Sequence, residues 1–371
     1  MNSSSSVSPP MHTPEHTWRV VGLVLLCARF VQGWIYWGGG SRRFIYAPSK
    51  IDPTAHHWMA NKFQTAMPGA LLGMDQVVSY MLQHFYLLYG GVIFFSAAEL
   101  FVGLFLIIGF YTRLAALASI GLSFVLMLLF GWQGATCIDE WTMAAANFGM
   151  GASIFLGGGG AFSVDAWRMK HRPGLASEPR FHWIASGPIS EVLLERVGKA
   201  LLVVTVVFVV ATYSYFRGSV VGAFHGGPVS PSRHHLTLSK GRLDAAGAVS
   251  FHVYLDGGSA DVPGHIVKIN LHDPQGKIIE SWNGKTLAAL PKSAFVNDYI
   301  YNQFEPGMVS IQAEVGAKAR IDLPPAPVVQ TDPVTVAVPP PLALISGGRY
   351  TLEAVTIDAK KFTTVVIYEG R

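Results

Sequence analysis

Long apolar runs separated by short polar stretches fill the first 216 residues of the chain. About 20 consecutive apolar residues are needed to cross the hydrocarbon core of a bilayer. Five segments approach that length, and the fourth is the shortest: 18–37, 85–110, 114–130, 143–156 and 197–216. The pattern therefore predicts a membrane α-helical bundle of about five transmembrane helices.

The pattern changes to period-two alternation in residues 217–371, as in Val249, Phe251, Val253 and Leu255. Such alternation is typical of half-buried β-strands. This run spans 249–255, and similar runs occur at 266–271, 309–315, 349–357 and 363–368. About seven short strands with turn signals between them indicate an all-β sandwich of immunoglobulin-like type.

Two local signals refine this β prediction. Asp273-Pro274-Gln275-Gly276 is expected to form a turn, because Pro presets the backbone dihedral at the second turn position. The Pro-rich stretch 323–341 cannot be a central strand throughout, since Pro removes a ladder hydrogen bond. We expect it to be a long connection or an edge.

The expected domain organisation follows from these patterns. Residues 1–17, rich in Ser and Pro, are predicted to be a disordered tail, and the absence of a basic n-region there makes the first helix a retained anchor. The remaining parts are a four-helix membrane bundle at 18–167, a basic loop at 168–196, a fifth helix at 197–216 and the β domain at 217–371.

Lys and Arg in the short loops set the expected orientation, because cytoplasmic loops carry an excess of these residues. The loop 131–142 has acidic residues but no Lys or Arg, whereas the loop 168–196 has five basic residues. The chain is therefore expected in the cytoplasmic (inner) membrane, with its amino terminus on the cytoplasmic side and residues 217–371 on the periplasmic side. The outer loop 38–84 departs from the rule through four basic residues: Arg42, Arg43, Lys50 and Lys62.

Composition supports a membrane protein, because 50% of the residues are hydrophobic and only 13% are charged, against roughly 25% in a typical soluble domain. The two cysteines, Cys27 and Cys137, form neither a CxxCH haem motif nor an iron–sulfur cluster motif. Adjacent pairs such as His234-His235 favour solvated loop residues over a metal site. The glycine run 157–160 follows a membrane helix and is not a phosphate loop after a strand.

Two ionisable residues lie within predicted membrane segments, Arg29 in the first and Glu99 in the second. A charge inside the bilayer costs a few kcal/mol and normally has a partner. Counting about 1.5 Å per residue from opposite faces places the two at similar depth. We therefore expect an Arg29–Glu99 ion pair, which would either lock the bundle or line a pocket and handle protons.

Small residues recur every fourth position on the predicted fourth helix, at Ala145, Gly149, Ser153 and Gly157. A ridge of small residues lets two membrane helices approach closely. The spacing therefore predicts a packing face along this side of the helix.

Motifs in both halves resemble known families. The membrane half resembles the DoxX/DoxD membrane family in Glu99-Leu-Phe-Val-Gly103, in Gly109-Phe-Tyr-Thr-Arg113, and in Arg29 with Gly33 and Ser41-Arg42-Arg43-Phe44. The carboxyl-terminal domain resembles the companion DoxA subunit in Trp282-Asn283, Leu290-Pro291-Lys292-Ser293 and Asn297-Asp-Tyr-Ile-Tyr301-Asn302.

A DoxD-like half joined to a DoxA-like half resembles a fused thiosulfate:quinone oxidoreductase. The resemblance implies oxidation of thiosulfate to tetrathionate, electron transfer to membrane quinone, and an acidophilic sulfur oxidiser as host. An electropositive outer vestibule would offset the repulsion between two thiosulfate dianions. The expected site residues are Arg42, Arg43 and Lys62 for thiosulfate, Arg29, Glu99 and Arg113 for quinone, and Arg29, Glu99 and Cys137 for catalysis.

The expected partners are thiosulfate, membrane quinone and lipid, with a homo-oligomer or further respiratory subunits left open and no nucleic acid. Quinone is expected as a diffusible electron acceptor, and no bound-cofactor motif is present. Two alternatives remain. The chain could be a non-catalytic membrane anchor for a partner enzyme, or an anion carrier whose bundle encloses Arg29 and Glu99.

Overall fold

The computed structural model describes residues 13–55, 57–134, 139–217, 229–230, 232–326 and 348–369. The chain forms two compact units. Unit 1 comprises Met1–His56, Tyr89–Met127 and Trp141–Tyr215, and unit 2 comprises His57–Leu88, Leu128–Glu140 and Phe216–Arg371. A helical part and a β part are both present, but two stretches of the helical half belong to the unit that contains the β-strands.

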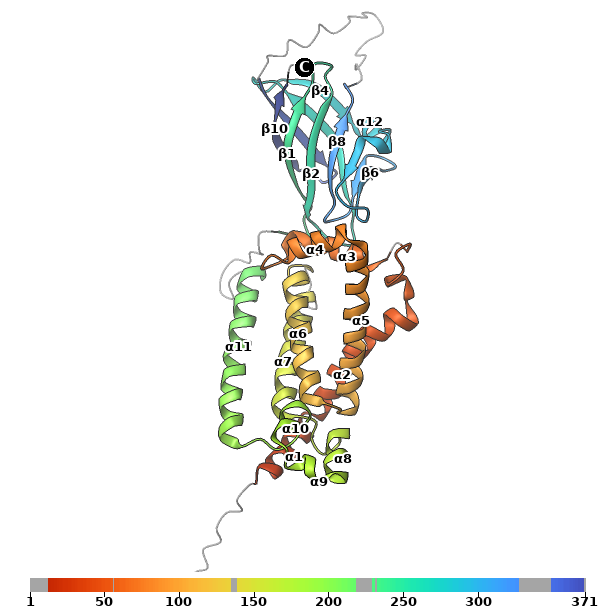
Figure 1. Ribbon diagram of the computed structural model, residues 1–371. Helices are drawn as coiled ribbons and strands as arrows, with labels where there is room; N and C mark the ends of the chain where they lie inside the picture. Colours follow the sequence, from red (N-terminus) through yellow and green to blue (C-terminus); the bar gives the residue numbers. More distant parts are fainter. Residues whose placement is uncertain are drawn as a thin grey trace, which may run out of the picture. The chain divides into compact units, whose positions relative to one another are not determined.

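Helices account for most of the described residues up to position 217 (Figure 1). Their bounds are α1 Pro14–Val24, α2 Leu26–Ser41, η1 Arg42–Tyr46, η2 Pro48–Lys50, α3 Met59–Ala66, η3 Met67–Gly69, α4 Met74–Gln83, α5 Phe85–Ile108, α6 Thr112–Phe130, α7 Glu140–Gly157, α8 Val164–His171, α9 Pro173–Ala176, α10 Pro179–Ile184 and α11 Glu191–Arg217.

Every segment predicted to cross the membrane is helical. Within the described residues, α5 and α6 are long and apolar enough to span a bilayer, and the bent pair α1 and α2 makes a third candidate. Along α11, exposed apolar side chains such as Val203 and Val207 suit contact with lipid. The total of five spans, with α7 and α11 as the fourth and fifth, stays a prediction.

The first predicted helix is two helices, because the chain breaks at Leu25 and bends by 55°. The glycine run after α7 packs against this bend. A Cβ on Gly22 would lie 2.3 Å from the Cα of Gly160, and a Cβ on Gly157 would lie 2.4 Å from a methyl group of Leu25. Glycine is therefore required where the loop after α7 crosses α1 and α2.

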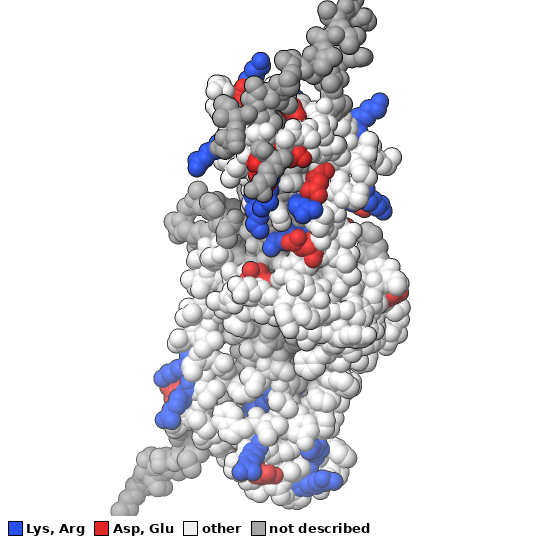
Figure 2. Space-filling model, turned by 45° about the horizontal axis from the view of Figure 1, so that its top comes forward, with Lys and Arg blue, Asp and Glu red and all other residues white. Residues whose placement is uncertain are grey.

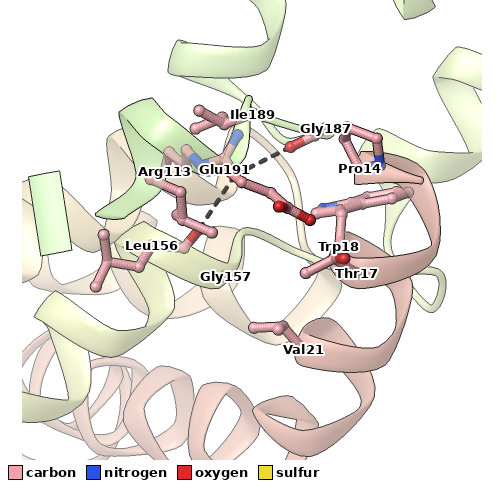
Figure 3. Close-up of a pocket in the computed structure, with 11 residues that line it drawn as sticks. Pro14, Thr17, Trp18, Val21, Arg113, Leu156, Gly157, Gly187, Ile189 and Glu191 are labelled. Carbon is pink, nitrogen blue, oxygen red and sulfur yellow. Dashed lines mark hydrogen bonds between the residues drawn. The ribbon is translucent and has the colours of Figure 1, made fainter. Parts of the chain in front are cut away.

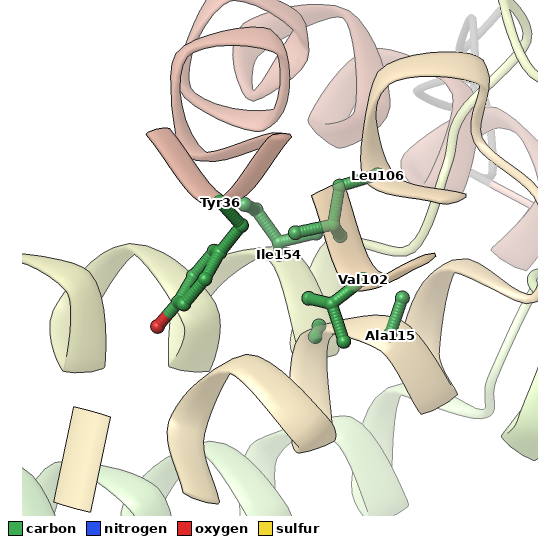
Figure 4. Close-up of a cluster of buried hydrophobic side chains, with 6 residues drawn as sticks. Tyr36, Val102, Leu106, Ala115 and Ile154 are labelled. Carbon is green, nitrogen blue, oxygen red and sulfur yellow. The ribbon is translucent and has the colours of Figure 1, made fainter. Parts of the chain in front are cut away.

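Four helices of unit 1 contribute to one apolar cluster (Figure 4). Its buried members are Tyr36 from α2, Val102 and Leu106 from α5, Ala115 and Ala116 from α6, and Ile154 from α7. Within the described part of the chain, α2 and α5 approach closely through glycine, since a Cβ on Gly40 would lie 2.5 Å from the backbone nitrogen of Leu100.

The predicted small-residue ridge on α7 is wrong as a continuous packing face. Ser153 is exposed, and a Cβ on Gly149 would meet no described atom within 4 Å. The buried side of α7 includes Asn147, Phe148 and Ile154 instead. A four-residue spacing drifts around a helix of 3.6 residues per turn, and the larger side chains decide which face is covered.

The β domain has ten strands among its described residues. Their bounds are β1 His235–Leu243, β2 Val249–Gly257, β3 Gly264–His272, β4 Ile278–Asn283, β5 Phe295–Asn297, β6 Phe304–Pro306, β7 Ile311–Ala313, β8 Lys318–Leu323, β9 Arg349–Thr356 and β10 Lys361–Tyr368, with α12 at Gly284–Ala288 and η4 at Lys292–Ala294.

The strands form one hydrogen-bonded sheet in the order β5-β8-β2-β1-β10-β9-β3-β7-β6, with β4 on β3, which confirms the predicted all-β domain. Its immunoglobulin-like sandwich type stays a prediction. Strand β1 connects β2 to β10 in this order, because it pairs antiparallel with β2 and, through Gly241–Leu243, parallel with β10. Strand β1 pairs with β2 on both sides of a bulge between Ser239 and Arg242, where Lys240 has a φ of 50°, and the pairing with β10 begins at Gly241 within this bulge. Such a bulge bends a strand and increases its twist.

The alternation predicted for 249–255 is confirmed, since β2 buries every second residue. The predicted turn at Asp273–Gly276 is also confirmed. It connects β3 to β4, the amide of Gly276 donates to the carbonyl of Asp273 at 3.0 Å, and Gly276 has a φ of 85°. Of the Pro-rich stretch 323–341, Leu323 ends β8, and the stretch from 327 onward lies outside the described residues.

Helices α3 and α4 pack with the β-strands inside unit 2. The fully buried Gln64 donates from its amide nitrogen to the carbonyls of Asn302 and Gly316, at 2.9 and 3.0 Å, and its oxygen accepts from the amide of Asn302 at 3.0 Å. Ser79 and Tyr299 share a hydrogen bond of 2.7 Å. Of the predicted outer loop 38–84, residues 57–84 are thus part of the β-domain unit, whereas residues 38–56 belong to unit 1.

Candidate functional site

Arg29 lies on α2, and only 4% of the residue is exposed. Its guanidinium donates to the carbonyl of Gly159 and, at 2.7 Å, to the carbonyl of Phe162. The predicted ion pair with Glu99 is wrong, because these carbonyls of the loop after α7 hold Arg29. The contact fastens that loop to α2. The catalytic and quinone-binding roles of Arg29 stay predictions.

Glu99 on α5 forms its ion pair with Arg43, which lies in η1 directly after α2. The Nη1 atom of Arg43 lies 2.6 Å from Oε2 of Glu99, and both side chains are about four-fifths buried. A Cβ on Gly39 would lie 2.6 Å from the same carboxylate oxygen, so glycine leaves room for Glu99 against α2. Arg43 of the basic outer loop and the intramembrane carboxylate of Glu99, which were predicted as separate features, therefore form an ion pair.

Breaking the Arg43–Glu99 pair on one side should destabilise unit 1, since the remaining charge loses its opposite charge in a mostly buried position. We expect Arg43→Met and Glu99→Leu each to lower the free energy of unfolding by about 1–3 kcal/mol. The double variant should lose less than the sum. Thermal unfolding in detergent measures these losses, with Arg42→Met, at the exposed neighbour, as the control. Strictly additive losses would contradict the pairing.

Two further buried polar side chains lie on the same face of α2 as Arg29. Gln32, fully buried, donates to the backbone carbonyl of Asn147 at 2.9 Å. The Tyr36 hydroxyl bonds to the carbonyl of Ser119 at 2.8 Å and to the hydroxyl of Ser123 at 2.9 Å. Sequence reasoning missed this stripe, although its spacing of three and four residues in an apolar run is a signal for one helix face.

Arg113, in the first turn of α6, is 1% exposed. Its guanidinium donates to four backbone carbonyls: Phe155 at 2.9 Å, Leu156 at 3.3 Å, Gly187 at 3.0 Å, and His182. The first two belong to the last turn of α7, whose carbonyls have no partner within the helix. Arg113 therefore joins α6 to the end of α7 and to the chain before α11.

Asp165 is fully buried at the start of α8, and its carboxylate binds the same end of α6 as Arg113. Its carboxylate accepts from the amides of Tyr111 and Thr112, both at 3.0 Å, and from the hydroxyl of Thr112 at 2.9 Å. A carboxylate on the first amides of a helix is favoured by hydrogen bonding and by the helix dipole. The motif that ends in Arg113 thus has a structural role here, which the sequence did not reveal.

A small cavity of about 20 Å³ opens beside Arg113 (Figure 3). It lies between α1, the end of α7 and the start of α11, and its polar lining includes Trp18 and Glu191. The indole Nε1 of Trp18 has no hydrogen-bond partner among the described residues. Neither Trp18 nor Glu191 was predicted as a site residue. Trp18 lies at the end of a predicted segment, where an interfacial role explains it, and Glu191 lies in the predicted loop 168–196.

The other predicted site residues have separate surroundings. Arg42 is exposed beside Arg43 in η1. Lys62 lies in α3 of unit 2, where its Nζ is 2.7 Å from Oε1 of Glu140 and 5.2 Å from the centre of the Phe130 ring.

Cys137 lies outside the described residues, and Cys27 is a free, exposed cysteine on α2. Within the described ranges, no group of three or more His, Cys, Asp and Glu side chains is arranged to hold a metal ion.

Charge is distributed unevenly over the helical unit. On the face shown in Figure 2, a broad belt of the helical surface carries almost no charged side chain, and charges gather at its end. An uncharged belt of this kind is what a lipid bilayer requires of a protein surface. Together with the apolar helices α5 and α6, it defines an integral membrane protein that carries a β-sheet domain.

Comparison with protein families identifies the two halves. Residues 24–189 match the family described as TQO small subunit DoxD, and residues 216–347 match the family described as TQO small subunit DoxA. TQO stands for thiosulfate:quinone oxidoreductase. The chain therefore consists of a DoxD part followed by a DoxA part, which together match a fused thiosulfate:quinone oxidoreductase, and the predicted resemblance is confirmed.

Proposed function

We propose that this chain oxidises thiosulfate to tetrathionate and passes the electrons to membrane quinone. Two thiosulfate dianions each lose one electron and join through a sulfur–sulfur bond. The quinone takes up these two electrons and two protons and becomes the quinol. The observation that carries the proposal is the match of one chain to both subunit families.

Thiosulfate is proposed to bind at Arg42 and Arg43. These two adjacent positive charges follow the carboxyl-terminal end of α2, and Arg42 is exposed to an incoming anion. Arg43 is held by Glu99 at 2.6 Å, so its guanidinium has a fixed position before the substrate arrives. The role of Lys62 in thiosulfate binding stays a prediction, since Lys62 belongs to unit 2, where Glu140 holds it.

Glu99 is proposed to exchange protons during quinone reduction, since it is the carboxylate inside the long apolar helix α5. Cys137 is proposed to carry a transient sulfur adduct. Its thiolate would join the outer sulfur of thiosulfate as two electrons pass to the quinone. A second thiosulfate would then attack that sulfur, which releases tetrathionate and regenerates the thiolate.

The cytoplasmic membrane is the proposed location, with the amino terminus inside and the β domain on the periplasmic side. The basic loop 168–196 and the acidic loop 131–142 support this orientation through the excess of Lys and Arg that cytoplasmic loops carry. Thiosulfate would then be oxidised outside the cell's cytoplasm, while quinone arrives from within the bilayer.

Purified chain in detergent, given thiosulfate and a soluble quinone, should reduce the quinone and form tetrathionate, with two thiosulfate ions consumed per quinone. Sulfite and sulfide should not replace thiosulfate. Arg42→Gln with Arg43→Gln should raise the KM for thiosulfate far more than the KM for quinone, because the lost attraction is to the anion. Added salt should slow the parent more than this variant.

Lys170→Gln, which removes an exposed positive charge of the predicted cytoplasmic loop, is the matched control and should leave both KM values unchanged. Activity that returns only with a co-purifying protein would make the chain one component of the enzyme. If thiosulfate never reduces quinone under either condition, the proposal fails, and a membrane anchor or an anion carrier takes its place.

A further inference from the structure

The cavity beside Arg113 has mixed walls. Aliphatic side chains form one part of its lining: Val21, Leu156, Ile189 and Leu194. Polar groups from Thr17, Trp18 and Glu191 form the other part (Figure 3). Apolar walls with a few polar groups are typical of small-molecule sites. Its volume of about 20 Å³ exceeds the space that one water molecule needs. The cavity therefore admits a group the size of a carbonyl, while a larger ring would rest at its mouth.

Trp18 supplies the strongest sign of a ligand. The residue is 8% exposed, and its indole N–H has no hydrogen-bond partner among the described residues. A buried N–H without an acceptor destabilises a protein by about 1–3 kcal/mol. Arg113 cannot accept a hydrogen bond, since a guanidinium has no acceptor atom. An acceptor oxygen brought by a ligand would satisfy the indole.

Glu191 gives the cavity a second chemical property. It is the first residue of α11, its side chain is exposed, and it lines the same cavity as Trp18. A carboxyl group at a water-exposed mouth can pass protons from solvent to a bound group. Its negative charge offsets the positive charge of Arg113 in the same lining, so the lining suits a neutral ligand with a carbonyl oxygen.

We propose that this cavity receives one carbonyl group of the quinone headgroup, while the ring lies at its mouth. The inference rests on the proposed function, gives that reaction a quinone site, and assigns the protonation of the bound quinone to Glu191 in place of Glu99. One quinone carbonyl oxygen accepts a hydrogen bond from Nε1 of Trp18, and the aliphatic side chains contact the ring. When two electrons from thiosulfate oxidation reach the ring, Glu191 gives a proton to one oxygen and takes another from water. The second oxygen takes its proton from solvent, which completes the quinol.

Binding of decylubiquinone to the purified full chain, without thiosulfate, tests the site directly. Trp18→Phe keeps the aromatic ring and removes only the N–H donor. We expect its Kd for decylubiquinone to rise about tenfold, the effect of one lost hydrogen bond. Trp167→Phe is the matched control, because Trp167 is an exposed indole on α8, and its Kd should equal that of the parent.

Leu194→Trp fills the mouth of the cavity from α11 and should abolish binding without removing any polar group. Glu191→Gln should leave the Kd unchanged but lower kcat for quinone reduction and flatten its pH profile. An unchanged Kd in Trp18→Phe, or normal binding by Leu194→Trp, would overturn the proposal and leave water in the cavity. Because binding is measured without thiosulfate, normal quinone binding in a chain that never oxidises thiosulfate would sink only the proposed function.

Discussion

Arg113→Met should unfold the membrane half at temperatures where the parent is stable. The substitution keeps an apolar stem but removes every donor from four carbonyls, two at the end of α7 and two in the chain before α11. Each buried acceptor left unpaired costs about 1–3 kcal/mol. We expect a total loss of about 3–5 kcal/mol, which places this variant among the most destabilising single substitutions.

Thermal unfolding of the detergent-solubilised protein, followed by helical circular dichroism, measures this loss. Arg180→Met is the matched control, because Arg180 is exposed on α10, and it should unfold within about 0.5 kcal/mol of the parent. Arg113→Lys should remain strongly destabilised, since an ammonium group cannot span four carbonyls as the planar guanidinium does. A stable, folded Arg113→Met variant would contradict the structural role and favour the predicted role in quinone binding.

The sequence was sufficient for the elements that depend on local periodicity. Apolar runs of membrane length identified α5 and α6, and alternation identified β2, because burial repeats with the period of the element itself. The bend between α1 and α2 was not predictable in this way. It depends on the contact between Gly22 and Gly160, which lie far apart in the chain.

The candidate site was less predictable, because depth along a helix does not determine which way a side chain points. Counting residues correctly placed Arg29 and Glu99 inside helices, yet Arg29 binds carbonyls of the loop after α7 and Glu99 binds Arg43. Carbonyl acceptors are present in every residue, so no residue type signals them. An ion pair predicted from charges alone overlooks that competition.

The division of the chain into units was also beyond the sequence pattern. Composition changes sharply after residue 216, whereas the structure groups α3 and α4 with the β-strands. The reason is a few specific hydrogen bonds, such as those between Gln64 and Asn302, in a segment whose composition resembles any outer loop. Single polar residues that bind backbone groups over long sequence distances leave no periodic signal.

Glu280 on β4 is a carboxyl group that the fold keeps away from water. Only 8% of the residue is exposed, and its Oε2 atom has no hydrogen-bond partner among the described residues. Burial raises the pKa of Glu280 to about 7, and repulsion from Asp244 adds to this, while a hydrogen bond from the amide of Ala326 opposes it. The folded β domain therefore favours the protonated carboxyl group.

The full-length protein should accordingly lose stability as the pH rises from 5 to 8. A folded-state pKa above the ordinary value of 4.5 gives a contribution that is complete below pH 4.5 and is lost as the pH rises through about 7. The loss should be at most about 3 kcal/mol.

Glu280→Gln keeps the shape of the side chain without its charge, so this variant should lack this part of the pH dependence, whereas the exposed control Asp261→Asn should retain it. Thermal unfolding midpoints of the β-sheet circular dichroism signal at pH 5, 6, 7 and 8 provide the measurement. Because histidines also titrate in this range, the informative quantity is the difference between each variant and the parent. Parallel pH curves for the parent and Glu280→Gln would show that Glu280 is ionised in the folded domain at all four pH values.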